Sequence, residues 1–558
     1  MMRSSSLLSV TALLGALPSY AVSPQVEVLN GTYEGYHLPR QKQDVFLGMP
    51  YAQPPVGSLR FQGPRSLNTT WSGVHPAKEY GDVCMQYTAD PGYSMSEDCL
   101  SLNVIRPSNI NGSERLPIAV WIHGGGLYSG SSYETNLTNF VFQGVASGNP
   151  FIAVSINYRL TAFGFLWGSD ELIANGSANN GLRDQRLALT WIQENIAFFG
   201  GDPSRVTIFG QSGGGLSVGK QLIAYGGRDD GLFHAAIMQS GGMAEKWPYN
   251  IQNPEIYTKD LYMNFTTTTG CADSSSPLEC LRELPVESLS AALNYTDTPV
   301  FSGTGLGPWI TQVDGDFLKD GPTESLEKAH FVNIPIMYTT TTDEATVYMY
   351  VDQIDTDADF RAFISAGGPD GETAATITKL YPKDLGLPVG WTPTKDEIAT
   401  YGAYWKQAVT FQTDVTETSS RRRTVDAWVT AGGTAYAGRI NILNPNSSAS
   451  LGSHHAVELA YVFNNIDAGG NQALENMSLL MSRVWASFVA HYDPNFHHVR
   501  GVPVWPRWNG SEAANERGKN FVFNTDGTRN STSYIEVDDY RLAQTRYLNS
   551  LMKSQMYY

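Results

Sequence analysis

The stretch Val206–Gly215 restricts the possible fold more than any other part of the chain. Its apolar run ends in glycines that flank one serine, and a helix-like segment, Leu216–Ile223, follows. Gly210, Ser212 and Gly214 occupy the fixed positions of a Gly-x-Ser-x-Gly elbow. Such a turn strains the serine backbone, and side chains on the neighbouring residues would clash. We therefore expect a strand, a sharp turn and a helix, although the pentapeptide alone also fits a plain Gly/Ser turn.

The segment around this elbow alternates apolar strands with helical stretches, from about residue 112 to residue 242. This alternation predicts a mostly parallel sheet covered by helices on both faces. No repeat or linker divides the chain, so we expect one large α/β domain. The expected strands are Pro117–Ile122, Phe151–Ile156, Arg205–Phe209, Ala235–Gln239 and Ile334–Tyr338, and the expected helices are Leu182–Phe199, Leu216–Ile223 and Met477–His491.

Composition narrows the classes of partner. The chain has 558 residues, is 42% hydrophobic and carries a formal net charge of -17. Nucleic acids and anionic membranes bind clustered Lys and Arg, so the net negative charge argues against either of them as a partner.

The first 21 residues read as a secretion signal, which leaves 22–558 as the mature domain. Arg3 supplies the positive end, Leu7–Leu17 the apolar stretch, and Ser19 and Ala21 the small residues before cleavage. The apolar stretch is too short to span a bilayer, so we expect a secreted protein without stable membrane insertion.

Dense Asn-x-Ser/Thr sequons agree with export, because secreted eukaryotic glycoproteins carry them on surface loops. The candidate glycosylation sites are Asn30, Asn68, Asn111, Asn136, Asn175, Asn264, Asn294, Asn446, Asn476, Asn509 and Asn530.

The cysteines form two local pairs, Cys84 with Cys99 and Cys271 with Cys280. In an oxidising compartment such short loops favour disulfides. A zinc site is a poor alternative, because neither pair has closely spaced His or Cys partners. We expect no bound metal.

A serine becomes an effective nucleophile when an imidazole takes its proton and a carboxylate orients that imidazole. In an α/β-hydrolase these partners follow the serine as Asp/Glu and then His. The acid candidates are Asp343 and Glu344, after the expected strand Ile334–Tyr338. The base candidates are His454 and His455, in a Gly-led loop before the apolar stretch Leu459–Phe463. The residues alone do not choose within either pair.

A glycine triplet, Gly124–Gly126, closes the early strand that ends in Trp121-Ile122. Glycines after a strand let backbone N–H groups face an oxyanion without interference from side chains. A phosphate-binding loop is the alternative, but its Gly-Lys-Ser/Thr ending is missing. His123, just before the triplet, fits a structural role better than a catalytic one.

Further motifs stand in order along the chain: Phe46–Ala52 with Pro54–Gly57 and Arg60-Phe61, Glu97–Asn103, Gly124–Gly126, Asn157–Arg159, Gly181–Gln185 and Phe199–Pro203. Together with the elbow, they resemble the carboxylesterase type B family of α/β-hydrolases, which includes fungal lipases, carboxylesterases and cholinesterases. The resemblance runs from about Val28 to Arg546.

This resemblance implies a choice within each pair of candidates. Ser212 matches the family nucleophile and Glu344 the triad acid. His455 matches the general base, four residues before the family's strand-like apolar stretch, which falls at 459–463 here, whereas His454 does not match. The implied oxyanion hole consists of the N–H groups of Gly125, Gly126 and Gly213. Also implied are a Ser240 hydroxyl near the acid, the disulfides Cys84–Cys99 and Cys271–Cys280, and the ion pairs Glu97–Arg60 and Asp184–Arg159.

The chain departs from the family pattern at positions that touch this site. Gln211 stands where the family usually has Glu, and Gly213 stands in place of Ala. Ala345 replaces Gly, and Leu127 replaces the common Phe. No substitution removes a catalytic group, but each bears on rate and specificity.

The sequence thus predicts a secreted serine ester hydrolase that forms an acyl-enzyme and needs no cofactor. Only Met85–Asp98 separates Cys84 from Cys99, and this loop is polar. It is too short for a long amphipathic lid, so we expect soluble short-to-medium acyl esters as substrates. A long-chain lipase or sterol esterase is one alternative, and a catalytically silent binding protein on the same scaffold is another. The sequence does not define the oligomeric state.

Overall fold

The computed structural model describes most of the chain between residues 23 and 552. The residues not described within that range are 88–91, 109, 111–113, 244–253, 296–307, 348–352, 384, 386–393, 444–446, 511–517 and 526–530. The expected signal at 1–21 and the sequons at Asn111, Asn446 and Asn530 lie outside the described residues.

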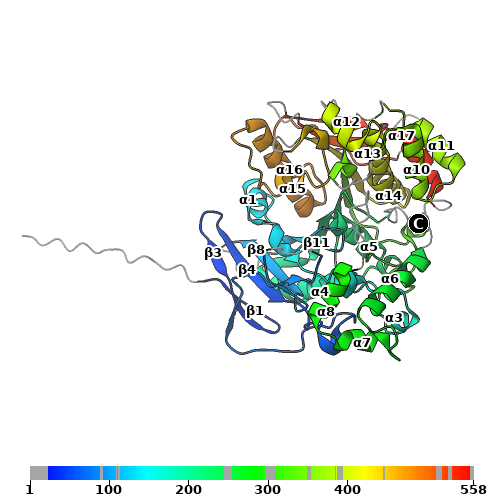
Figure 1. Cartoon of the computed structure of the whole chain (residues 1–558). Coiled ribbons are helices and arrows are strands. Elements are labelled where there is room, and N and C mark those ends of the chain that lie inside the picture. Colours follow the sequence, from blue (N-terminus) through cyan, green and yellow to red (C-terminus); the bar gives the residue numbers. More distant parts are fainter. Residues whose placement is uncertain are drawn as a thin grey trace, which may run out of the picture.

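One large sheet organises the molecule, and within the described residues it has eleven strands in the order β16-β15-β14-β13-β12-β11-β9-β10-β8-β4-β3. The strands from β10 through β9 and β11 to β15 run parallel, and the pairs at both edges are antiparallel. Figure 1 shows β3 and β4 at one side of the molecule. The strands are β3 (Tyr36–Leu38), β4 (Gln43–Pro50), β8 (Ser101–Pro107), β9 (Leu116–Ile122), β10 (Ile152–Ile156), β11 (Gly201–Gln211), β12 (Ala235–Gln239), β13 (Ile336–Thr341), β14 (Ala435–Ile442), β15 (Lys519–Thr525) and β16 (Ser531–Val537).

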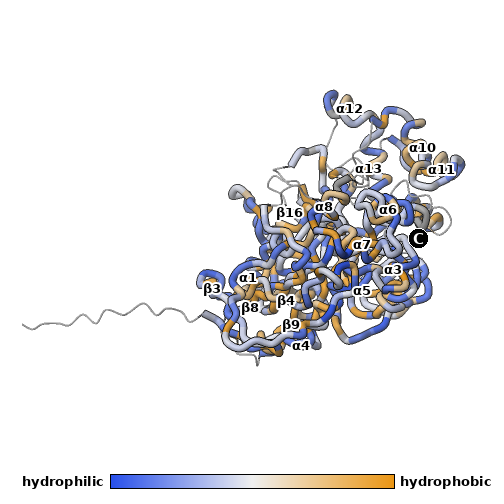
Figure 2. The backbone as a smooth tube through the Cα atoms, turned by 60° about the horizontal axis from the view of Figure 1, so that its bottom comes forward, coloured by the Kyte–Doolittle hydropathy of each residue, from blue (hydrophilic) through white to orange (hydrophobic). Residues whose placement is uncertain are grey.

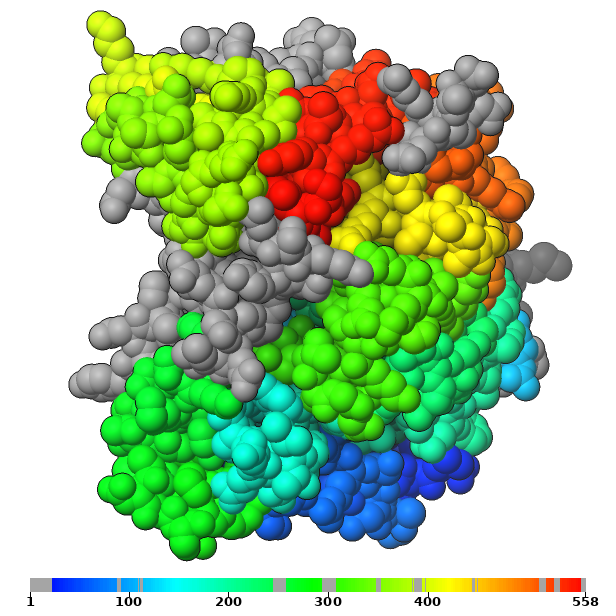
Figure 3. Space-filling view, turned by 90° about the vertical axis from the view of Figure 1, so that its right-hand side faces the viewer, coloured from blue at the N-terminus to red at the C-terminus, as the bar shows by residue number. Residues whose placement is uncertain are grey.

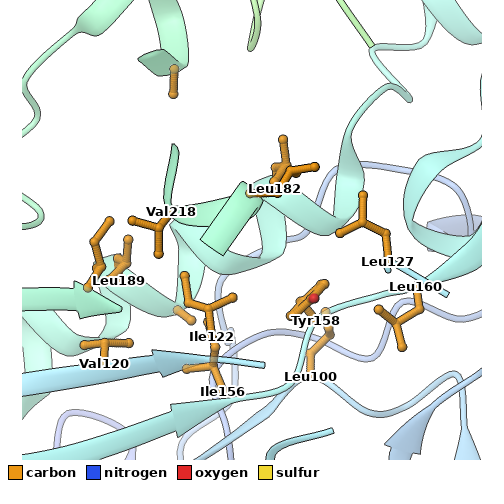
Figure 4. Packing of buried hydrophobic residues seen from close by; sticks show 14 of the residues in the cluster. Leu100, Val120, Ile122, Leu127, Ile156, Tyr158, Leu160, Leu182, Leu189 and Val218 are labelled. Atoms are coloured by element: carbon orange, nitrogen blue, oxygen red, sulfur yellow. The ribbon is translucent and has the colours of Figure 1, made fainter. Parts of the chain in front are cut away.

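Helices cover both faces of this sheet because successive strand residues point to opposite sides. Val120 and Ile122 of β9 join one buried cluster with α4 and α5 (Figure 4), whereas Ala119 and Trp121 join another with α1 and α16. Figure 2 shows hydrophobic segments gathered in the centre around β4 and β9. These helices are α1 (Thr138–Ala146), α4 (Asn180–Asn195), α5 (Gly213–Gly227) and α16 (Gln472–His491).

A separate apolar cluster lies beside the sheet and joins the end of the chain to helices from the middle of the sequence. Leu548 and Leu551 of α17 pack with Phe360, Ile377 and Phe411. In Figure 3 the red C-terminal segment accordingly lies against the yellow-green helices. The helices involved are α10 (Asp357–Ala366), α11 (Gly371–Leu380), α13 (Trp405–Thr413) and α17 (Leu542–Leu551).

The smaller elements connect these layers. They include β1 (Gln25–Val28), β2 (Gly31–Glu34), β5 (Val74–Pro76), β6 (Val83–Cys84), β7 (Met95–Ser96), α2 (Thr161–Phe165), α3 (Asp170–Ala174), α6 (Pro254–Thr268), α7 (Pro277–Glu283), α8 (Val286–Tyr295), α9 (Pro322–Glu327), α12 (Lys395–Tyr401) and α14 (Ser419–Thr430).

The predicted α/β architecture is confirmed. Every predicted strand and helix of the alternating segment is present, Ala235–Gln239 with the predicted bounds and the others with shifted ends. Strand β11 begins at Gly201, four residues before the expected start, because Gly201 also pairs with Leu116 across a register shift. The expected helix 182–199 is divided, since its last residues, Ile196–Phe199, tighten into a 3-10 turn that ends at Gly200 with φ +87°.

One expectation is wrong: the stretch at 459–463 contains no strand. Leu459–Val462 forms the short helix α15, which packs on α16. Tyr461, Val462 and Phe463 are buried in the cluster that α16 shares. A short apolar run does not distinguish strand from helix, and here packing against α16 decides.

The two disulfides and two ion pairs implied by the resemblance are present in the structure. The disulfides Cys84–Cys99 and Cys271–Cys280 have Cα–Cα distances of 5.0 and 5.6 Å. The buried pair Arg159–Asp184 has an N–O distance of 2.7 Å, and Arg60–Glu97 one of 2.6 Å. Arg60 also donates to the carbonyls of Leu281, Arg282 and Leu284, so this ion pair anchors α7 to the N-terminal region.

The surface of the described chain is consistent with the predicted glycosylation. Asn68, Asn136, Asn175, Asn264, Asn476 and Asn509 are exposed, and Asn30 is half-buried. Among the helices of the described part, none combines the length and the apolar character needed to cross a bilayer.

The end of the chain is held by a buried charge network centred on Asp538. Arg422 donates to both carboxylate oxygens at 2.6 and 2.8 Å, Arg421 donates at 3.1 Å and Asn520 at 2.8 Å. Burial alone would raise the pKa of Asp538, but the two guanidinium groups hold it well below its usual range. The carboxylate is therefore ionised and compensates two buried cations.

Asp538→Asn should lower the free energy of unfolding by about 3–5 kcal/mol, because it leaves buried guanidinium groups without their counter-charge. Guanidinium chloride unfolding midpoints measure this loss. Asp316→Asn is the matched control: its side chain is 66% exposed in a pair with Arg183, so it should cost less than about 1 kcal/mol. Equal losses for both variants would contradict the assigned role of Asp538.

Candidate active site

Ser212 sits on a strained turn between β11 and α5. Its backbone has φ 57° and ψ -128°, and its N–H donates to Gln239 O at 2.9 Å. A Cβ on Gly214 would lie 2.0 Å from Ile122 O, and one on Gly210 would lie 2.5 Å from the Gly214 carbonyl. Only glycine fits at these two positions, so the sharp elbow predicted from the sequence is formed. Ser212 keeps partial exposure at the carboxyl end of the central strand.

An acid–base pair forms from residues beyond β13 and β14. The Nδ1 atom of His455 lies 2.6 Å from Oε2 of Glu344, which is fully buried. The other oxygen, Oε1, accepts from the Ser240 hydroxyl at 2.6 Å and from Thr341 N–H at 2.5 Å. Burial would raise the pKa of Glu344, but the His455 contact and these hydrogen bonds bring it below its ordinary value. The structure thus places an ionised carboxylate against the imidazole.

Asp343 and His454, the neighbours of this pair in the sequence, connect the loop after β13 to the loop after β14. Asp343 Oδ2 accepts from Ser453 N–H at 3.0 Å, and Asp343 bridges to His454. His454 Nδ1 lies 2.8 Å from the His455 carbonyl. Asp343 and His454 therefore hold the loops together and leave Glu344 and His455 to meet.

The Nε2 edge of the His455 ring, opposite Nδ1, points toward the elbow at Ser212. Its Nε2 lies 3.1 Å from the amide nitrogen of Gln211, the residue before Ser212. An amide nitrogen only donates, so Nε2 is the acceptor and the ring proton lies on Nδ1, toward Glu344. This is the tautomer that a general base needs.

The glycine loop after β9 lies opposite the start of α5. A Cβ on Gly213 would lie 3.1 Å from Gly126 N and 3.2 Å from Leu127 N, and one on Gly124 would lie 3.1 Å from Ser212 Cβ. The backbone amides of the loop and of the helix start thus meet beside the serine. That arrangement, at a helix N-terminus, suits a developing negative charge.

His123 has a structural position behind this loop. It is buried, stacks on Tyr158 with 4.4 Å between ring centroids, and its Nδ1 lies 2.9 Å from Gly124 O. Burial lowers its pKa to about 4. A neutral His123 therefore holds the Gly124 carbonyl.

The sequence reasoning missed a further buried carboxyl group, Glu458, three residues after His455. Its Oε1 accepts from Gln239 Nε2 at 3.1 Å, and no donor among the described residues reaches its Oε2. Gln239 also connects Glu458 to the elbow, because its backbone carbonyl accepts from Ser212 N–H. Its side-chain Oε1 accepts from Trp485. The available signal was a single charged residue inside an apolar run.

Burial raises the pKa of Glu458 to about 7, and repulsion from Glu344 adds to this shift. The described residues contain no group of three or more His, Cys, Asp or Glu side chains placed to hold a metal ion.

Ligands bind where parallel strands end, and here the serine, the acid–base pair and the glycine loop gather at that edge of the sheet. The fold and the elbow define an α/β-hydrolase. The chain belongs to the carboxylesterase family, whose family model matches residues 22–533.

Two lipases and one solved structure that are similar to this chain support its assignment to the carboxylesterase family. Lipase 5 of Diutina rugosa is 32% identical over 90% of this chain and 93% of its own. Secreted lipase 1 of Botryotinia fuckeliana is 30% identical, with 88% of each chain covered. The crystal structure of Aspergillus niger EstA aligns with a TM-score of 0.80 and 26% identity over 96% of this chain and 99% of that one. The protein is a carboxylic ester hydrolase.

Glu458→Gln tests the buried carboxyl group through the pH dependence of stability. The raised pKa means that protonated Glu458 contributes stability fully below pH 4.5 and loses it as the pH rises to about 7. As the pH rises across that window, the free energy of unfolding of the variant should therefore increase relative to that of the wild type by about 1.4 kcal/mol per pH unit. Denaturant midpoints at several pH values measure the difference. Glu372→Gln, at an exposed position of α11, is the control, and a pH-independent difference for Glu458→Gln would contradict the assignment.

Proposed function

We propose that the protein hydrolyses esters through a covalent acyl-enzyme on Ser212, with His455 as general base and Glu344 as the acid of the triad. The observation that carries the proposal is the 2.6 Å contact between His455 Nδ1 and buried Glu344. It orients an imidazole whose Nε2 atom faces Gln211, the residue next to a strained, partly exposed serine.

In the first half of the reaction, His455 Nε2 takes the Ser212 proton while Oγ attacks the ester carbonyl. The N–H groups of Gly125, Gly126 and Gly213 stabilise the oxyanion, and the alcohol leaves with the proton from His455. In the second half, a water activated by the same imidazole attacks the acyl-enzyme and releases the acid.

Two further side chains support these steps. The Ser240 hydroxyl, hydrogen-bonded to Glu344, keeps that carboxylate ionised and aligned. The Gln211 amide keeps Nε2 of His455 unprotonated in the resting state. Ser240 and Gln211 thus act through Glu344 and His455 rather than on the substrate.

We also propose that residues 1–21 direct secretion and that the mature chain, 22–558, is one glycosylated catalytic domain. The secreted lipase of Botryotinia fuckeliana among the relatives supports this, as do the exposed sequons.

Ser212→Ala should abolish labelling by a fluorophosphonate probe and lower kcat by on the order of 10⁶-fold, because the hydroxyl is the nucleophile. Ser204→Ala, at an exposed serine of β11, is the matched control and should label like the wild type. A wild-type protein that resists the probe would favour a silent binding protein on this scaffold.

For the substrate, we propose soluble esters with short-to-medium acyl chains. Cys84 and Cys99 are only 15 positions apart, which leaves little chain for an amphipathic lid. The first residues of that segment, Met85 and Gln86, are themselves buried. The lipases among the relatives favour the alternative, a long-chain lipase.

Turnover of p-nitrophenyl butyrate should therefore exceed turnover of an emulsified long-chain triglyceride, without a rate increase at the solubility limit of the substrate. Initial rates measured across that limit decide the question. A sharp rise on emulsion formation would contradict the short-acyl proposal and leave the nucleophile assignment untouched.

A further inference from the structure

The loop that carries the proposed oxyanion donors has a strained backbone. Gly125, Gly126 and Gly130 have φ of +97°, +59° and +102°, and the non-glycine residue Leu127 has φ +64°. Glycine adopts such angles readily, but a positive φ at a residue like Leu127 persists only where surrounding structure imposes it. The position of the donors therefore depends on what restrains this loop.

Restraints at the start of the loop come from the loop itself and from its neighbour in the fold. The Gly125 carbonyl accepts from the N–H groups of Tyr128 and Ser129 at 3.0 and 2.9 Å, and the Leu127 carbonyl accepts from Thr161 N–H at 2.9 Å. These bonds close the turn but leave its far end, Gly130, to other partners.

That far end is held by a side chain from the disulfide segment. Gly130 N–H donates to Gln86 Oε1 at 2.7 Å. Gly130 packs so closely on the loop start that a Cβ there would lie 2.5 Å from Gly124 O. A shift of Gly130 would therefore displace Gly124 and the two donors that follow it.

The residue after Gln86 makes a parallel contact. Tyr87 N–H donates to Tyr128 O at 3.1 Å, and the hydroxyl of Tyr87 accepts from Trp309 Nε1 at 3.0 Å. Cys84, two residues before Gln86, is bonded to Cys99. The start of the disulfide segment is thus fixed at one end by a covalent bond and lies along the glycine loop.

Burial of Gln86 is energetically unfavourable apart from its contact with Gly130. Its side chain is buried, and its amide nitrogen finds no acceptor among the described residues. An unpaired buried donor is unfavourable, so the contact with Gly130 is what the glutamine contributes at this position.

We infer that Gln86 is a positioning residue for the oxyanion hole, and that the Cys84–Cys99 bridge supports the catalytic loop through it. This inference rests on the proposed oxyanion role of Gly125 and Gly126. Gln86 itself acts on the loop, through the N–H group of Gly130, and not on the substrate.

Gln86→Met tests the inference, because methionine keeps the length and volume of the side chain and removes the acceptor oxygen. We expect kcat to fall about 10- to 100-fold, less than the loss of a whole oxyanion donor, while KM stays within about twofold. Gln143→Met, which removes a buried glutamine of α1 that donates to Asn464, is the matched control and should leave kcat unchanged.

A trifluoromethyl ketone separates this role from a general loss of stability. Ser212 Oγ adds to its carbonyl carbon, the serine proton passes to His455, and the ketone oxygen becomes an oxyanion. The affinity for this ketone should fall in Gln86→Met by the same factor as kcat/KM. If Gln86→Met does not fold, Gln86→Asn, whose shortened amide cannot keep the 2.7 Å contact, should show the same selective loss.

The outcomes distinguish this inference from the proposed function. Unchanged kcat and ketone affinity in folded Gln86→Met would overturn the inference alone, provided that the wild type binds the ketone and Ser212→Ala does not. A wild type that neither hydrolyses esters nor binds the ketone would overturn both.

Discussion

The strained backbone of Ser212 is the constraint on which the rest of the site depends. A positive φ at a residue other than glycine costs on the order of 1–3 kcal/mol and must be imposed by its surroundings. Here β11 pairs with parallel strands on both sides, Gln239 O holds the serine N–H, and Gly214 lies directly against Ile122 O. The sheet therefore sets the position of the hydroxyl, and α5 can begin at the next residue.

The same sheet brings the remaining groups together, although they are far apart in the sequence. Glu344 follows β13 and His455 follows β14, while the glycine loop follows β9. Parallel strands end at one edge, so each connection delivers its residues to the same place. What holds them there is local: Asp343 and His454 tie the two loops, and Gln86 reaches the glycine loop from the disulfide segment.

Much of this could be predicted from the sequence, because glycine spacing and β-branched runs report directly on turns and strands. The Gly210-x-Ser212 elbow and the order of the central elements are examples. The residues alone left the choice between Asp343 and Glu344 open, because the backbone path decides which one faces the imidazole; only the family resemblance implied Glu344. The helix Leu459–Val462 and the buried Glu458 were missed for a related reason: both depend on packing against distant segments.

The neutral side chain at position 211 completes the electrostatic balance of the site. Gln211 lies 3.1 Å from His455 Nε2, and a carboxylate at that distance would favour a proton on this nitrogen. Ionised Glu344 lies on the opposite, Nδ1 side of the ring, and burial raises the pKa of Glu458 to about 7. With glutamine at 211, the His455 ring contacts a carboxylate, Glu344, on its Nδ1 side and a neutral amide on its Nε2 side.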